Sequence, residues 1–175
     1  MVDQTGENSK INLRGGLSIT VVQIKQIQKS INRLMGIVPA QYILLVDTSG
    51  QLVSTAGDKS MIDSSILGSL IAADLAASQE IARLTGEFQE YQMILREGDR
   101  TNIIISEAGK QLAFLVLFSR ETPIGWARKL IQNAAKEIGA LVSQSVNATQ
   151  EERISPIEGN LPSLFNDALD EIWKD

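Results

Sequence analysis

Few side chains in this sequence could carry chemistry. Its 175 residues include no histidine and no cysteine, which excludes the commonest general acid–base group near neutral pH, thiolate catalysis, disulfides and cysteine metal sites. An enzyme of this composition would have to use carboxylates, lysine, tyrosine or serine. Asp47 is one such carboxylate, but it directly precedes Thr48-Ser49-Gly50. An aspartate at that position is more often a turn residue that accepts hydrogen bonds from its own backbone.

Two arginines, Arg100 and Arg120, stand next to predicted strand ends. Either could act as an arginine finger, which accelerates phosphoryl transfer by a large factor, but a solvated charge is the more common role. The chain has no G-x-x-x-x-G-K-[ST] sequence, so it is not itself a P-loop NTPase. We therefore expect no catalytic residue, no metal site and no cofactor.

The charge balance also limits the partners. The formal net charge is −5, and the 16 basic residues form no run, which argues against a general nucleic-acid binder and against a polybasic membrane anchor. The longest apolar run, residues 112–118, is far shorter than the roughly 20 residues of a membrane-spanning helix, and the N-terminus lacks the pattern of a signal peptide. We expect a cytoplasmic protein that binds other proteins, with neither nucleic acid nor membrane as partner.

The hydrophobic periodicity predicts the elements that must position any site. Residues 1–17 are polar and glycine-containing, and are expected to be a flexible tail. A helix is expected from Ser18, its N-cap, to about Gly36. The remaining expected elements are strands 42–46 and 51–55, helix 63–84, strands 88–96, 101–106 and 112–118, helix 123–142, linker 144–160 and amphipathic helix 161–174.

This order predicts the fold class α/β, of the α+β type. Five antiparallel strands lie between helices in one domain, residues 18–143, and a C-terminal amphipathic helix, residues 161–175, follows on the linker. Strand 112–118 is apolar on both faces and is expected in the middle of the sheet. An edge strand must be covered, charged or paired. Strand 88–96 is the candidate for pairing with its own copy in a homodimer, through Tyr91, Met93 and Leu95.

Helix 63–84 combines large apolar residues with small ones. We expect its large residues to pack in the core; they include Leu67, Leu70, Ile71 and Leu75. The small residues are explained by close helix packing or by a flat platform for a partner protein. The platform candidates are Ser69, Ala72, Ala73 and Ala76.

The C-terminal helix must dock its apolar face, because an isolated helix of this length is marginal in water. It could dock on its own domain or in a groove of a partner protein, where aromatic residues make good anchors. The acidic residues of its polar face argue against a membrane surface. The predicted anchors are Phe165, Leu169, Ile172 and Trp173.

Four segments carry a resemblance to a known family. They are QYILLVDTSG at 41–50, LIAADLAAS at 70–78, GEF at 86–88, and LAFLVLF at 112–118 followed by PIG at 123–125. In this order and spacing they resemble the Roadblock/dynein light chain family, and within it the bacterial gliding-motility members. The resemblance covers about residues 18–143.

The resemblance implies a role. Members of the family form homodimers whose sheets join into one continuous sheet, and they bind small Ras-like GTPases such as MglA. The gliding-motility members activate GTP hydrolysis without an arginine finger, by holding the GTPase's own catalytic residues in place. The small-residue helix would face the GTPase, and the C-terminal helix would meet a second surface of it. The alternative is a homodimeric scaffold or localisation adaptor with no effect on GTP turnover.

Overall fold

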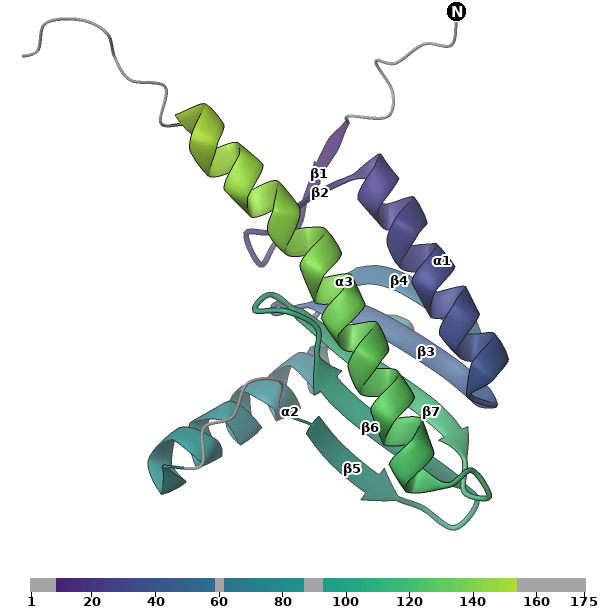
Figure 1. Ribbon diagram of the computed structural model, residues 1–175. Coiled ribbons are helices and arrows are strands. Elements are labelled where there is room, and N and C mark those ends of the chain that lie inside the picture. The colour runs from purple at the N-terminus through teal and green to yellow at the C-terminus, as the bar shows by residue number, and fades with distance from the viewer. Residues whose placement is uncertain (1–8, 59–61, 87–92, 154–175) are drawn as a thin grey trace, which may run out of the picture.

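A five-stranded antiparallel sheet between two layers of helix forms the body of the molecule (Figure 1). The computed structural model describes residues 9–58, 62–86 and 93–153, and of residues 144–153 only the backbone. Its elements are β1 (Lys10–Asn12), β2 (Ser18–Thr20), α1 (Val21–Ile37), β3 (Ala40–Asp47), β4 (Leu52–Gly57), α2 (Ser64–Thr85), β5 (Met93–Glu97), β6 (Thr101–Glu107), β7 (Leu112–Ser119) and α3 (Ile124–Arg153). The predicted fold class is confirmed.

The sheet has the order β4-β3-β7-β6-β5, with every neighbouring pair antiparallel. Strand β7 is central, as its apolar sequence predicts, since both of its faces are covered. Strands β4 and β5 are the two edges. The prediction that the strand containing Met93 and Leu95 lies at an edge is therefore confirmed.

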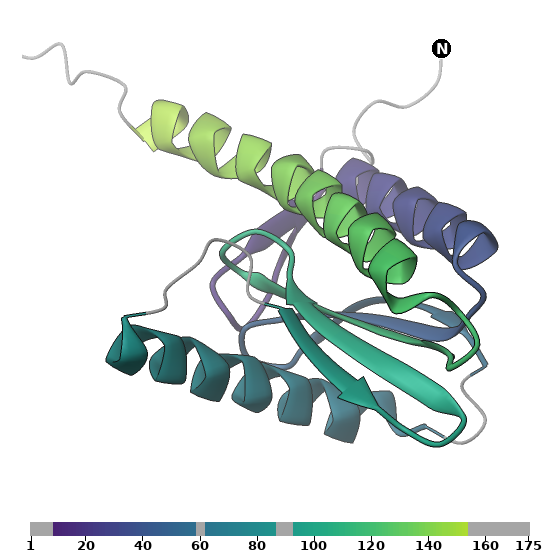
Figure 2. The same cartoon turned by 60° about the horizontal axis from the view of Figure 1, so that its bottom comes forward.

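Two separate hydrophobic clusters cover the two faces of the sheet. Helices α1 and α3 pack on one face and α2 packs on the other (Figure 2). Strand β3 supplies both clusters, because successive side chains of a strand point to opposite faces. Ile43 and Leu45 belong to the α1/α3 cluster, whereas Tyr42, Leu44 and Val46 belong to the α2 cluster.

The N-terminal segment differs from the expected flexible tail. Residues 10–20 form a hairpin in which β1 pairs antiparallel with β2, and Leu17 is buried in the α1/α3 cluster. The prediction is wrong for residues 10–17, because Gly15 and Gly16 make a tight turn there rather than a loose chain, and Gly16 has a φ of +83°. Residues 1–8 lie outside the described residues.

The start of α1 also differs from expectation. Ser18 lies in β2, and the N-cap is Thr20, whose hydroxyl accepts a hydrogen bond from the Gln23 amide at 3.2 Å. The Gln23 side chain accepts one from the Thr20 amide at 2.9 Å, so the two residues form a capping box. The sequence pattern therefore predicted the helix start two residues too early, within β2.

The last described helix continues well past the predicted boundary. Helix α3 runs to Arg153, so the predicted linker is wrong for residues 144–153. These residues are polar, but they include no glycine or proline that would end a helix. Residues 154–160 and the predicted helix 161–175 lie outside the described residues.

Candidate interaction surfaces on α2

Helix α2 has sharply defined ends and one buried stripe. Asp63 caps its start by accepting hydrogen bonds from the Ser65 and Ile66 amides at 2.9 and 3.1 Å. Gly86, with a φ of 73°, ends it in the left-handed conformation typical of a helix C-terminus. Its buried residues, Gly68, Ile71 and Leu75, follow the three-four spacing of one helix face.

Two exposed sides flank that buried stripe, since successive residues of a helix are about 100° apart. We call them the apolar side and the small-residue side. Along the helix, the apolar side consists of Ile66, Leu70, Ala73, Ala77, Ile81 and Leu84. The small-residue side consists of Ser65, Ser69, Ala72 and Ala76, followed by Glu80 and Arg83.

The apolar side exposes large aliphatic side chains. Leu70 is 61% exposed, Ile81 62% and Leu84 71%. The prediction that Leu70 packs in the core is therefore wrong, because residue type alone does not distinguish a core stripe from an interface stripe on the same helix. Ala73 also departs from expectation, because it lines the groove on this side of the helix. It remains next to Ser69 and Ala76, which lie four and three residues away along the helix.

An open groove of about 510 Å³ runs beside the apolar side, between α2 and the strands next to the β5 edge. At its rim, Arg96 of β5 donates two hydrogen bonds to Asp74 of α2, at 2.7 and 3.0 Å. This pairing raises the pKa of Arg96 above its usual value. The groove is mostly apolar and is lined by Leu67, Leu70, Ile71, Ala73, Asp74, Arg96, Ile103, Ile105 and Leu115.

Strand β5 adjoins this groove and leaves its outer edge without a neighbouring strand in the described part of the chain. Met93 is half-buried and packs on the α1/α3 cluster, and Leu95, two residues on, lies on the same face and is exposed. Tyr91, the third residue predicted for the dimer interface, lies outside the described residues. Met93 and Leu95 thus point to the sheet face opposite the groove, whereas Arg96 of the same strand lines the groove. Through Arg96, the strand edge adjoins the groove and the apolar side of α2.

The small-residue side rests on the turn between β3 and β4. Gly50 has a φ of +83°, and a Cβ atom there would lie 2.7 Å from the Ser69 Cα atom. A Cβ atom on Gly68 would lie 2.6 Å from the Gly50 carbonyl oxygen. Such a close approach of backbone to backbone requires glycine at both positions. Ser69 and Ala76 are exposed and Ala72 is half-buried above this contact.

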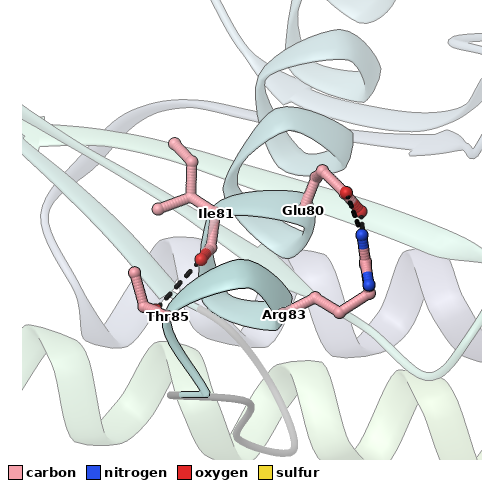
Figure 3. A network of polar contacts seen from close by, with 4 residues as sticks. All are labelled: Glu80, Ile81, Arg83 and Thr85. Carbon is pink, nitrogen blue, oxygen red and sulfur yellow. Dashed lines mark hydrogen bonds and ion pairs between the residues drawn. The ribbon is translucent and has the colours of Figure 1, made fainter.

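The far end of α2 shows both sides together (Figure 3). Ile81 points away from the pair formed by Glu80 and Arg83, whose Nε donates to the Glu80 carboxylate at 2.9 Å. That hydrogen bond lowers the pKa of Glu80 and raises the pKa of Arg83. The ion pair of Glu80 and Arg83 therefore lies on the small-residue side, away from Ile81.

Asp47 is a structural turn residue, as its position predicts. Its carboxylate is buried and accepts hydrogen bonds from the amides of Gly15, Ser49 and Gln51, at 2.8, 2.9 and 2.8 Å. Burial raises the pKa of Asp47, but the hydrogen bonds from Ser49, Gly15 and Gln51 outweigh it, so the pKa lies below its ordinary value. The carboxylate is thus held charged as part of the turn.

The two candidate arginine fingers lie elsewhere. The Arg120 amide donates to the Arg100 carbonyl, at the end of β6 and β7 opposite the β3–β4 turn that supports Ser69. Both side chains are exposed. Neither arginine therefore borders the small-residue side.

Two kinds of feature are absent from the described residues. No helix among them is both long and apolar enough to cross a membrane. They also contain no group of three or more acidic, histidine or cysteine side chains placed to hold a metal ion.

Comparison with known proteins decides the family. Residues 26–118 match the model of the Roadblock/LC7 domain. The chain belongs to the Roadblock/LC7 family. The matched residues include most of α1, all of α2 and nearly the whole five-stranded sheet, and they end before α3. A comparison with curated protein sequences gives no match.

Solved structures agree with this assignment. MglB of Myxococcus xanthus is 30% identical, aligns over 69% of this chain and 90% of its own, and superposes with a TM-score of 0.65. A gliding protein MglB from Thermus thermophilus is 20% identical over 75% of this chain and 99% of its own, with a TM-score of 0.66. An MglB with a tetrameric arrangement is 21% identical over 75% and 98%, with a TM-score of 0.66. The two more distant structures share the fold.

The structure sorts the predicted binding residues into three groups. Ser69, Ala72 and Ala76 lie together on the small-residue side, and Ala73 lies on the apolar side. The predicted anchors of the C-terminal helix lie outside the described residues; they are Phe165, Leu169, Ile172 and Trp173. Sequence reasoning missed Ile66, Ile81 and Leu84 as interface candidates. The sequence did contain a signal for them, because these large residues repeat at the same spacing as the small residues but are displaced by one position along the helix.

Proposed function

We propose that this chain is a homodimeric regulator of a small Ras-like GTPase similar to MglA, and that it activates GTP hydrolysis without supplying an arginine finger. The observation that carries the proposal is the pair of exposed sides on α2. One is apolar and adjoins a free strand edge, and the other carries the small residues Ser65, Ser69, Ala72 and Ala76. A single helix thus offers one surface for a second copy and another for a partner.

The apolar side is the surface proposed for the homodimer. Exposed aliphatic residues gathered around an apolar groove mark an interaction site, and a free strand edge is satisfied by pairing with another strand. In a twofold dimer each copy offers the same surface to the other. Pairing of β5 with its copy would bring the two grooves together and remove Leu70, Ile81 and Leu84 from water.

The small-residue side is the surface proposed for the GTPase. Short side chains lose little rotamer entropy on binding, so a rigid helix that presents them can meet a flexible segment at low entropic cost. Holding the switch segments of the GTPase in one arrangement would orient its attacking water and its own catalytic residues. The predicted anchors Phe165, Leu169, Ile172 and Trp173 would contact a second surface of the same GTPase.

The test is the rate of GTP hydrolysis by a purified small Ras-like GTPase similar to MglA, measured with and without this protein. The wild-type chain should stimulate hydrolysis, and Ala76→Arg should remove the stimulation, because a long charged side chain blocks the flat surface. Ala140→Arg is the matched control, since Ala140 is an exposed alanine of α3, on the other face of the sheet. Stimulation that survives Ala76→Arg would contradict the proposed surface. Binding with no stimulation by the wild-type chain would support the scaffold instead.

A further inference from the structure

The two carboxylate oxygens of Asp47 hold two different segments of the chain. Oδ1 accepts hydrogen bonds from the Ser49 amide at 2.9 Å, the Ser49 hydroxyl at 2.6 Å and the Gln51 amide at 2.8 Å. Oδ2 accepts from the Gly15 amide at 2.8 Å. One oxygen therefore builds the β3–β4 turn, and the other holds the loop of the N-terminal hairpin.

The hairpin loop lies directly on that turn. The Arg14 amide donates to the Gln51 side-chain carbonyl at 2.8 Å, next to the bond from Gly15 to Asp47. A Cβ atom on Gly15 would lie 2.8 Å from the Thr48 hydroxyl oxygen and 2.9 Å from Asp47 Oδ2. A methyl group at position 15 would therefore push against the Thr48 and Asp47 side chains of the turn.

The same turn supports the beginning of α2. Gly50 ends the segment that Asp47 organises, and its backbone touches the backbone of Gly68 and Ser69. Ser69 opens the part of the small-residue side proposed to meet the GTPase. Direct contacts therefore connect the hairpin loop to that side through one buried carboxylate and one glycine contact.

We propose that Asp47 is a positioning residue through which the N-terminal hairpin fixes the first turns of α2 and thereby sets the affinity of the small-residue side for its partner. The hairpin lies outside the residues 26–118 that match the family model. The link to affinity rests on the proposed function, whereas the coupling of hairpin to helix does not.

Two substitutions cut the link by different means. Asp47→Asn is nearly isosteric. The three hydrogen bonds accepted at Oδ1 require an oxygen there, so the new NH₂ group takes the place of Oδ2 and faces the Gly15 amide. Two donors then face each other without an acceptor. Gly15→Ala keeps the carboxylate and separates loop from turn by steric contact. The matched controls are Asp63→Asn, because asparagine caps a helix as well as aspartate does, and Gly125→Ala, which has open space around it.

Amide hydrogen exchange tests the coupling without any partner. Both Asp47→Asn and Gly15→Ala should speed exchange about tenfold in the hairpin and in residues 66–72 of α2, since a buried donor loses its acceptor. Exchange in β7 and α3 should stay as in the wild type. Faster exchange confined to the hairpin would overturn the proposal, and so would a uniform rise in all elements, which is the mark of general destabilisation.

Affinity for the GTPase tests whether the coupling of the hairpin to α2 affects partner binding. Asp47→Asn and Gly15→Ala should weaken binding about tenfold at unchanged dimer affinity, and both controls should bind as the wild type does. Coupled exchange with unchanged binding would overturn the role in affinity. Ala76→Arg, measured alongside, separates the two ideas. If the Ala76→Arg variant binds the GTPase normally, the proposed contact surface is wrong. The hydrogen-exchange result still decides whether the hairpin is coupled to α2.

Discussion

The two exposed sides of α2 share one spacing of residues but differ in the size of the side chains and in what lies beside them. Each has residues at successive intervals of four, three, four, four and three. On the apolar side these positions expose large aliphatic residues beside a groove and a strand edge. On the small-residue side they present serine and alanine above a glycine-mediated backbone contact. Large apolar residues suit a lasting interface that buries them, and small ones suit contact that forms and breaks.

The largest expected effect comes from placing a charge on the apolar side. Leu70→Asp should convert the proposed homodimer to a monomer, weakening self-association by roughly 100-fold or more, because it would bury an unpaired carboxylate in the proposed interface. The monomer should stay folded, since Leu70 is largely exposed. Sedimentation velocity measures the association. Leu52→Asp, at an exposed leucine of the opposite edge strand β4, should leave it unchanged, and a dimer that tolerates Leu70→Asp would refute this assignment.

The support beneath the small-residue side can be broken at Gly50. Gly50→Ala should destabilise the fold by well over 1–2 kcal/mol, because the left-handed backbone alone costs about that much and the new methyl group meets the α2 backbone. Gly86→Ala has a similar φ but open space, and should cost only the backbone strain. Urea denaturation compares the two variants. Equal losses would show that the contact between Gly50 and Ser69 is absent in solution.

Acid should weaken the same support, because Asp47 holds it as a charged carboxylate. The pKa of folded Asp47 lies below its ordinary value of 3.8. Its stabilising contribution is therefore fully present above that value and is lost as the pH falls through the lower folded pKa. Asp47→Asn should lose about 1–3 kcal/mol at pH 7 and show less acid dependence than the wild type. Denaturation series at pH 7 and at pH 3 measure this, and parallel losses in both proteins would contradict it.

The smallest effect is expected at the exposed pair that ends the small-residue side. Arg83→Ala should leave the melting temperature and the stimulation of GTP hydrolysis unchanged, because this exposed ion pair is screened by solvent and the proposed mechanism uses no arginine finger. Hydrolysis assays with saturating variant protein check this. Stimulation that falls by several orders of magnitude would identify Arg83 as a finger.

The sequence predicts the sheet and its central strand well, because Leu112 to Phe118 is apolar on both faces and can lie only in the middle. It also predicts the ends of α2, where Asp63 and Gly86 carry strong local signals. It fails for Ser18, where a short hairpin mimics a helix start, and for residues 144–153, where polar composition conceals a continuing helix.

The candidate site was only partly predictable, for a physical reason. Ala72 and Ala73 are neighbours in sequence but lie about 100° apart around the helix, so they belong to different sides. Leu70 has the residue type of a core position and the location of an interface position. Distinguishing these needs the position of the sheet beneath the helix, which depends on long-range contacts such as that between Gly50 and Ser69.

The most direct test of two sides with two partners is a pair of identical substitutions at neighbouring positions of one helix. Sedimentation velocity with labelled GTPase would report self-association and complex formation together. The Ala76→Arg variant should remain dimeric and no longer bind the GTPase. The Ala73→Arg variant, changed at the groove, should lose self-association before it loses GTPase binding. If both variants lost the same partner, the separation of the two sides would be contradicted.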